Sequence, residues 1–324
     1  MIKRNTYCEV EFLKKFSAGY IPQLSPYDVG ILQKNHCWLG LYHFLKDKAY
    51  LIIDDASLFN SLAKENDFCT RIKKLWANGN LKIEEQKIDF SSSLKEDIYS
   101  YIFLCNDHTI SEQDAKHLGI LVITPSSYSQ FTYLFEENGI AIHKEDAFDW
   151  NLIMNKSNFN ALVITDKYIL TERNNNLYVL LDALLPESLQ IQMHISIFTL
   201  DTPTFEKDFL EIEAYIKSVR PKLQFNLTLH KAIENDFHDR AIITNYMRVK
   251  CGAGFDLIKI KNGTKVSRTT TEVEMDYPCF LEKALAEGSY ENILLDAKRM
   301  YRCNYYLGTK NNRLLNGSIG ESFT

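Results

Sequence analysis

A histidine, an arginine and two glycines stand at fixed spacing in the stretch HDRAIITNYMRVKCGAGFD, which covers residues 238–256. Residues two positions apart on an extended chain point to the same side, so His238 and Arg240 are expected to project together. An imidazole can attack phosphorus or move a proton near neutral pH, and a guanidinium grips phosphate oxygens. Gly252 and Gly254 lack side chains and leave backbone N–H groups open to an anion. The stretch therefore predicts a site for a phosphate-containing ligand.

Other side chains of the region extend this candidate site. Asn245, where the chain turns, is a candidate catalytic residue with His238 and Arg240. We expect Asp256, Arg248 and Lys250 to bind the ligand, the last two by adding positive charge. His230 ends the strand before the motif and is a candidate second imidazole. The alternating apolar residues of 223–229 favour instead a histidine that packs in the core.

The same stretch also fits a β-hairpin whose polar end has only an architectural role. The basic residues between Arg240 and Arg268 would then lie on the solvent face of paired strands. His238 would cap a strand end and pair with Asp236 or Asp239. This alternative needs no ligand.

The spacing His238-x-Arg240-x4-Asn245-x6-Gly252-Ala253 resembles the HxKxxxxD motif and following Gly-Ser of the phospholipase D superfamily. Arg replaces Lys, Asn replaces Asp and Ala replaces Ser. The stretch is more similar to the phospholipase D-like domain at the C-terminus of MIT-domain proteins, which carries HDR, an Asn at the turn and a GxGxD-type segment that here ends at Asp256. This resemblance implies a mixed-sheet α/β domain from about residue 151 to the final helix.

The resemblance also limits what the site can do. In active members one histidine forms a phosphohistidine, and a second histidine from another copy of the motif protonates the leaving group. This chain has one copy, because no other histidine is followed two positions later by Lys or Arg. Catalysis by that route would need a homodimer in which two His238 side chains meet at a two-fold axis.

We therefore expect recognition of a phosphate-containing ligand without turnover, since the MIT-type variant is regarded as a binding domain. One alternative is a homodimeric, metal-independent phosphodiesterase or nuclease with His238 as nucleophile. The other is a protein-interaction module without a ligand. No cofactor and no metal is expected for any of the three.

The elements that must position these residues follow from the pattern of apolar residues. In the second half of the chain we expect strands at 161–170, 189–200 and 223–230, helices at 174–188, 205–221 and 290–308, a hairpin that turns near Asn245 and a second hairpin within 259–275 with Asn-Gly at its tip. Asp166, Lys167 and Tyr168 follow the first of these strands, where they either border the site or only turn the chain.

The first half alternates short apolar runs with a helical pattern, which predicts an α/β domain with parallel, two-sided buried strands. The expected strands are 49–56, 101–107 and 119–125, with one helix over 57–79. Asp54, Asp55 and Asp107 stand at strand ends, where carboxylates can hold Mg²⁺ or Mn²⁺. We expect them instead to make helix caps or salt bridges, with Asp55 and Ser111 as N-caps.

Together these patterns predict an α/β domain of unknown role at 1–148, a phospholipase D-like domain at 149–308 and a flexible tail at 309–324. The composition, 45% apolar and 24% charged, is that of a globular chain long enough for two domains. The seven scattered cysteines form no CxxC pair, so a reducing cytoplasm is expected rather than a disulfide framework or zinc site.

Charge and hydropathy bear on the partners. The chain has no apolar run of about 20 residues, so no transmembrane segment is expected. The net charge of −5 argues against a protein coated in positive charge but allows a local basic groove. Nucleic acid is favoured over lipid because no amphipathic membrane helix is evident, and the resemblance suggests a role in a prokaryotic defence system. A homodimer and a protein partner are both compatible with the sequence.

Overall fold

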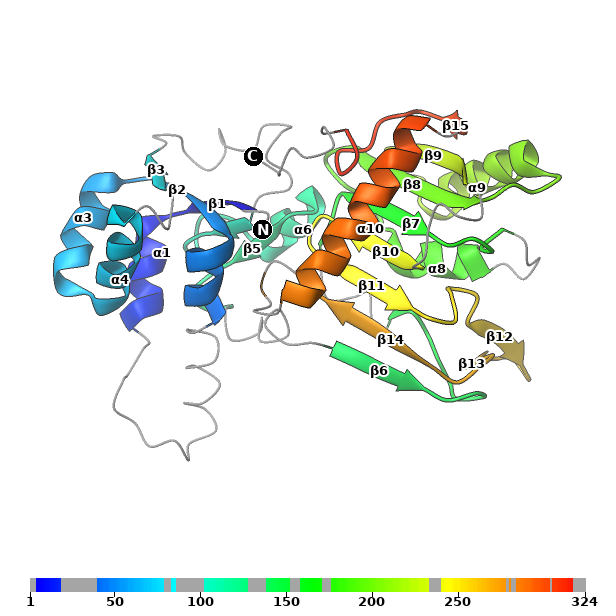
Figure 1. Ribbon diagram of the computed structural model, residues 1–324, viewed down its shortest axis with the longest axis horizontal. Coiled ribbons are helices and arrows are strands. Elements are labelled where there is room, and N and C mark those ends of the chain that lie inside the picture. Colours follow the sequence, from blue (N-terminus) through cyan, green and yellow to red (C-terminus); the bar gives the residue numbers. More distant parts are fainter. Residues whose placement is uncertain are drawn as a thin grey trace. The chain divides into compact units, whose positions relative to one another are not determined.

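The computed structural model divides the chain into two compact units (Figure 1). Unit 1 comprises residues 1–136, 277–287 and 321–324, and unit 2 comprises 137–276 and 288–320. The structure describes residues 4–18, 40–78, 83–85, 102–127, 138–151, 158–170, 176–232, 240–277, 280, 284–303 and 305–316. Both units combine helices with parallel strands, so the predicted α/β class is confirmed.

The sheet of unit 1 has five parallel strands in the order β3-β2-β1-β4-β5. These strands are β1 (Arg4–Cys8), β2 (Ala49–Ile53), β3 (Ile83–Glu85), β4 (Ile102–Leu104) and β5 (Leu121–Ile123). The parallel pairing confirms the prediction made from the continuous apolar runs. The central strand β1, however, was not foreseen from the sequence.

The helices of unit 1 are α1 (Val10–Ala18), the π-helix η1 (Phe44–Lys48), α3 (Ala56–Glu65), α4 (Asp67–Ala77) and α6 (Glu112–Leu118). The prediction of one helix over 57–79 is wrong, because the chain leaves the helical conformation at Asn66. The Asn66 side chain accepts a hydrogen bond from the Cys69 N–H at 3.1 Å and so starts a second helix.

Of the acidic side chains at the strand ends, Asp55 forms the expected helix cap, whereas Asp107 binds the backbone and hydroxyl groups of Ser126 where a cap or salt bridge was expected. Asp55 caps α3 by accepting from the Leu58 N–H at 2.8 Å, and Asp54 accepts from the Val10 N–H at the start of α1, also at 2.8 Å. Asp107 accepts from the Ser126 N–H at 3.0 Å. Among the described residues of both units, no cluster of His, Cys, Asp and Glu side chains is arranged to hold a metal ion.

The main sheet of unit 2 has eight strands in the order β15-β9-β8-β7-β10-β11-β14-β6. Strands β7, β8 and β9 are parallel and the other neighbours are antiparallel, so the sheet is mixed. The strands are β6 (Asn138–Ile142), β7 (Ala161–Thr165), β8 (Met193–Leu200), β9 (Phe225–Ala232), β10 (Ala241–Thr244), β11 (Arg248–Cys251), β14 (Thr271–Asp276) and β15 (Tyr306–Gly308).

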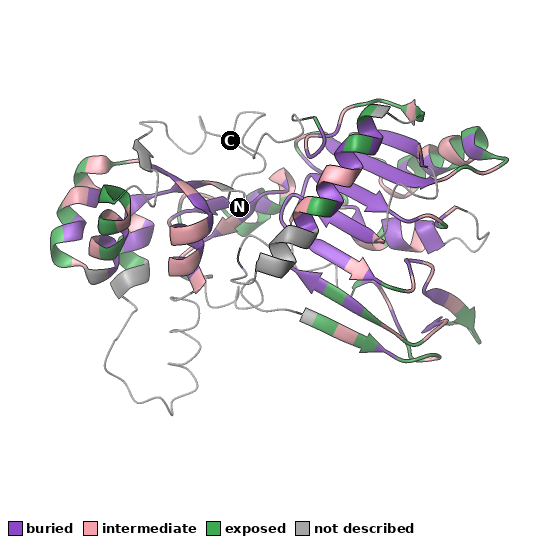
Figure 2. Ribbon diagram, viewed as in Figure 1, coloured by how far each residue is buried: buried purple, intermediate pink, exposed green. Residues whose placement is uncertain are grey.

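Helices lie on both faces of this sheet, with α10 (Ala284–Cys303) on one face and α8 (Asn176–Leu184) and α9 (Phe205–Val219) on the other (Figure 1). The central strands are accordingly buried along almost their whole length (Figure 2). A separate hairpin of β12 (Ile258–Lys261) and β13 (Thr264–Ser267) turns at Asn262 and Gly263, which both have positive φ. The predicted Asn-Gly turn is therefore confirmed.

The expected flexible tail is wrong for residues 309–316, which pack against the sheet. Asn312 is fully buried, and its Nδ2 donates to the Leu162 carbonyl and to Ser196 Oγ, both at 3.0 Å. Leu314 and Leu315 are also buried. The polar composition misled the prediction because these hydrogen bonds compensate for burying an amide. Residues 317–324 lie outside the described residues.

Among the described residues, no helix combines the length and the apolar character that a membrane-spanning segment requires.

The buried amide of Asn312 gives a test of this packing. Asn312→Ala removes three side-chain hydrogen bonds, to Leu162, Ser196 and Leu314, which should lower the free energy of unfolding by about 1–3 kcal/mol. Urea unfolding followed by circular dichroism measures the change. Asn311→Ala, which removes only an exposed side-chain contact to Asn316, is the control and should cost less than about 0.5 kcal/mol. Equal stability of the two variants would contradict the packed position of this segment.

Candidate functional site

Arg240 lies at the edge of the sheet where β7 ends and β10 begins. These strands are antiparallel, and Ala241 pairs with Thr165, so the next residues along, Arg240 and Asp166, become neighbours. Arg240 Nε is 3.9 Å from Asp166 Oδ1, and the Arg240 side chain is 29% exposed while the carboxylate is almost fully buried. A permanently charged group is thus anchored at its base and open to solvent at its tip.

The Asp166 carboxylate is held from two directions by backbone groups. Oδ1 accepts from the Tyr168 N–H and Oδ2 accepts from the Phe255 N–H, each at 2.9 Å. These bonds join the turn after β7 to the glycine segment after β11. The Tyr168 ring, 41% exposed, lies beneath the guanidinium with its centroid 5.2 Å from Arg240 Cζ. Asp166 and Tyr168 therefore both lie beside Arg240.

Gly254 permits this close packing. Its φ is +84°, and a Cβ at this position would lie 2.6 Å from Arg240 Nη1 and 3.0 Å from Asp166 Oδ2. Its N–H donates to the Cys251 carbonyl at 3.0 Å, so the expectation of an N–H open to an anion is wrong for Gly254. Gly252 is exposed, and among the described residues no heavy atom lies within 4 Å of the place its Cβ would take.

His238, the predicted nucleophile, lies outside the described residues. The structure therefore brings together Arg240 and Gly254 of the predicted constellation and places Gly252 in the same turn.

Asn245 lies at the opposite end of β10 and does not join this site. Five residues of extended chain separate it from Arg240, a distance of roughly 16 Å. It is fully buried, and its Oδ1 accepts from the backbone N–H groups of Asn160 and Ala161 at 3.1 and 2.9 Å. Its Nδ2 donates to Asn160 Oδ1 at 3.0 Å. Asn245 thus satisfies buried backbone groups at the start of β7, which corrects its expected catalytic role.

Arg248 and Lys250 were both expected to contact the ligand, but they lie in different surroundings. Arg248 is buried at the Asn245 end of the hairpin, where its Nε donates to Asp276 Oδ1 at 3.1 Å and its Nη2 is 3.7 Å from Glu274. Its charge is therefore used within the sheet and is not available to a ligand. Lys250 pairs in register with Ala241 and is half-buried at the Arg240 end.

Asp256 anchors the chain that follows Gly254. Its carboxylate accepts a hydrogen bond from Asn176 Nδ2 and is 3.5 Å from Arg268 Nε. Asn176 Oδ1 in turn accepts from the Ile258 N–H at 3.1 Å. Asp256 therefore has structural contacts through Oδ1, where a ligand contact was expected.

His230 is the packed core residue that its strand pattern favoured and is not a second imidazole beside Arg240. It stacks on Phe198, with centroids 4.4 Å apart and the rings 12° from parallel, and it also contacts Tyr301. Strands β7 and β8 separate it from β10, a span of about 14 Å. Neither ring nitrogen has a hydrogen-bond partner among the described residues, and burial lowers the pKa of His230 to about 3.

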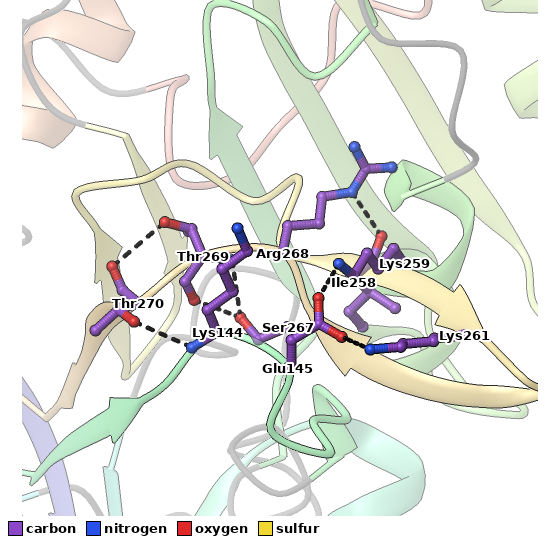
Figure 3. A network of polar contacts seen from close by, with 9 residues as sticks. All are labelled: Lys144, Glu145, Ile258, Lys259, Lys261, Ser267, Arg268, Thr269 and Thr270. Atoms are coloured by element: carbon purple, nitrogen blue, oxygen red, sulfur yellow. Dashed lines mark hydrogen bonds and ion pairs between the residues drawn. The ribbon is translucent and has the colours of Figure 1, made fainter.

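The basic residues of the β12–β13 hairpin are paired with acids of unit 2. Lys259 and Lys261 both donate to Glu145 (Figure 3). Lys265 Nζ donates to Asp149 Oδ2 at 2.9 Å. Arg268 Nε donates to the Ile258 carbonyl at 3.0 Å. The two lysines lower the pKa of Glu145 to about 2. The positive charge expected for a basic groove therefore serves to hold this hairpin.

Comparison with known protein families gives no match to this sequence, and comparison with curated proteins gives none either.

The two glycines of the turn offer a matched pair of substitutions. Gly254→Ala places a Cβ against Arg240 and Asp166 at positive φ, which should lower the free energy of unfolding by about 1–3 kcal/mol. Gly252→Ala meets no atom and should change stability by less than about 0.5 kcal/mol. Urea unfolding of both variants measures the difference. Equal effects would contradict the close seat of Arg240 against Gly254.

His230 should make stability depend on pH. Its folded pKa of about 3 lies below the unfolded value of about 6.5, so its contribution is complete above pH 6.5 and is lost as the pH falls. Between pH 7 and pH 5 the wild type should lose about 2 kcal/mol through this residue. His230→Phe, which keeps the ring stacking, should reduce the loss by that amount in urea unfolding at the two pH values. His143→Phe on the surface is the control, and identical pH dependence of all three proteins would contradict a buried neutral imidazole.

Proposed function

We propose that unit 2 recognises a phosphate group through Arg240, and that the ligand is a nucleic acid. The observation that carries this proposal is the seat of Arg240, whose guanidinium is anchored by buried Asp166 and Gly254 yet remains partly exposed above Tyr168. An arginine that is already held in one position loses less side-chain entropy when the ligand binds.

The guanidinium keeps donors for a ligand. It has five N–H groups, and the described contact with Asp166 is an ion pair at 3.9 Å, which is longer than a hydrogen bond. Two backbone N–H groups already bind the carboxylate oxygens, so the acid positions the arginine without occupying all its donors. The planar fork of an arginine matches two phosphate oxygens.

The positions of the other histidines support a protein that binds the phosphate group without cleaving its ester bond. The route implied by the resemblance to phospholipase D-like domains uses two imidazoles, and His230 is buried away from Arg240. His238 precedes Arg240 by two residues in the sequence and is the one candidate left in the motif. The mixed sheet with helices on both faces agrees with the fold that the resemblance implies.

A nucleic acid fits better than a lipid surface. The large exposed apolar side chains described in unit 2 include Leu210 on α9 and Ile260 on β12, and these stand on separate elements. Membrane-binding faces need contiguous apolar area, which such isolated residues do not supply. A cytoplasmic location, expected from the scattered cysteines, and a role in a prokaryotic defence system, suggested by the resemblance, belong to this proposal.

Arg240→Ala tests the phosphate contact directly. Loss of a charge-assisted hydrogen bond should weaken binding of labelled DNA or RNA by about 10- to 150-fold, measured by fluorescence anisotropy. Arg240→Lys should restore part of the affinity because it keeps the charge but not the fork. Arg299→Ala removes an equally charged but exposed side chain from α10 and serves as the control. Equal affinity of the Arg240→Ala and Arg299→Ala proteins would refute the site.

The same preparations separate a binder from an enzyme. His238→Ala should alter affinity alone, and the wild-type protein should leave the oligonucleotides intact with or without added divalent metal. Metal-independent cleavage that disappears in His238→Ala would instead establish a phosphodiesterase.

A further inference from the structure

Several loops of unit 2 meet at the edge of the sheet that carries Arg240. The carboxyl ends of parallel β7, β8 and β9 lie at this edge, and antiparallel β10 begins there. Tyr168 therefore follows β7, the segment 201–207 follows β8, and Lys231 lies near the end of β9 on the same edge as Arg240. Ligands of open α/β sheets commonly bind at such carboxyl edges.

A cavity of about 520 Å³ opens among the loops that follow β8 and β9. This volume is within the range of small-molecule sites, roughly 300–1,000 Å³. Its lining residues are Asp201, Thr202, Pro203, Thr204, Phe205, Glu206, Lys207, Lys231 and Tyr305. The cavity lies one to two strands beyond β7 from Arg240, about 10–14 Å measured across the sheet.

An exposed aromatic ring forms part of the cavity wall. Tyr305 is 55% exposed, and its ring centroid is 6.2 Å from that of Phe205, which is buried beneath it. The backbone of Tyr305 is fixed, because its carbonyl accepts from the Lys231 N–H at 2.9 Å. A rigid, half-exposed tyrosine over a cavity offers a flat face on which a planar ring can stack.

The cavity lining carries two acids, Asp201 and Glu206, and two lysines, Lys207 and Lys231. Lys231 is paired with Asp201, and Lys207 Nζ is 3.4 Å from Oε1 of Glu211, which stands outside the lining. The wall is therefore polar and close to neutral, which suits an uncharged planar group with hydrogen-bonding edges better than a second phosphate. A nucleobase has this chemistry.

We propose that the ligand is a single strand of nucleic acid, with a phosphate on Arg240 and an unpaired base of the same strand in the cavity against Tyr305. This inference rests on the proposed function for Arg240. A stacked strand advances about 3.4 Å per nucleotide, so the separation corresponds to a few nucleotides. Tyr168, beneath the guanidinium, gives a second stacking surface at the Arg240 end. Bases inside a duplex have no free face, so the site selects single strands.

Binding of labelled single-stranded DNA and RNA of about ten nucleotides, and of the matching duplexes, tests the proposal by fluorescence anisotropy. Tyr305→Ala should weaken single-strand binding by about 5- to 100-fold and leave duplex binding unchanged. Tyr305→Phe should retain wild-type affinity because the ring persists. Trp76→Ala, which removes an exposed ring from unit 1, is the control. The DNA and RNA arms show whether the sugar matters.

Salt dependence adds a second readout. Because the cavity lining has equal numbers of acids and lysines, the logarithm of the binding constant should fall with the logarithm of salt concentration by a slope of only about −0.7 for the phosphate engaged by Arg240. A slope several times steeper would show that further cationic side chains contact the strand and would contradict a phosphate contact confined to Arg240.

The outcomes separate the two proposals. If Arg240→Ala weakens binding but Tyr305→Ala does not, the cavity site is refuted and the phosphate site stands. If Tyr305→Ala weakens binding but Arg240→Ala does not, the cavity site stands and the phosphate site is refuted. If the protein binds phosphatidylserine vesicles but none of the oligonucleotides, a nucleic-acid ligand is refuted for both the phosphate site and the cavity site.

Discussion

The buried carboxylate of Asp166 is the interaction on which the site of unit 2 depends. It binds the Tyr168 and Phe255 N–H groups and lies beside Arg240, so three separate stretches of chain meet at one group. A buried charge is costly unless it is paired and hydrogen-bonded, and here each oxygen accepts a backbone N–H while the arginine supplies the countercharge. The position of the guanidinium is therefore a consequence of satisfying Asp166.

The pairing of β7 with β10 brings Arg240 to that carboxylate, and Asn245 secures the pairing from its other end. Asn245 binds the backbone of Asn160 and Ala161 at the start of β7, the strand that Asp166 follows. A slip of one residue in this register would turn every side chain of β10 to the opposite face. Asn245 thus helps to position Arg240 by fixing the register of β10 against β7.

Local sequence patterns predicted much of this fold. The parallel strands of unit 1, the hairpin around Asn245 and the Asn-Gly turn all follow from apolar runs and turn chemistry over neighbouring residues. The central strand β1 was missed because its five residues, RNTYC, carry little apolar signal although the sheet buries most of them.

The site was harder to foresee because its partners are distant in sequence. The i, i+2 spacing could suggest that Arg240 projects from a strand, but only the strand order shows that Asp166 lies beside it. Arg248 has the positive charge expected of a ligand contact. It is nevertheless buried against Asp276, because β11 pairs with β14. Whether a charged side chain is buried in an ion pair or open to a ligand depends on such tertiary neighbours, and these cannot be identified from a single sequence.

The place of Asn312 has a consequence for how the chain acquires its fold. Its amide bridges β7 and β8 at the middle of the sheet, through a contact with Leu162 that spans 150 positions of sequence. The adjoining strand β15 likewise completes the sheet only by pairing with β9. During synthesis, the centre of unit 2 can therefore be completed only after residues 306–312 have left the ribosome. Contacts of such long range also slow folding.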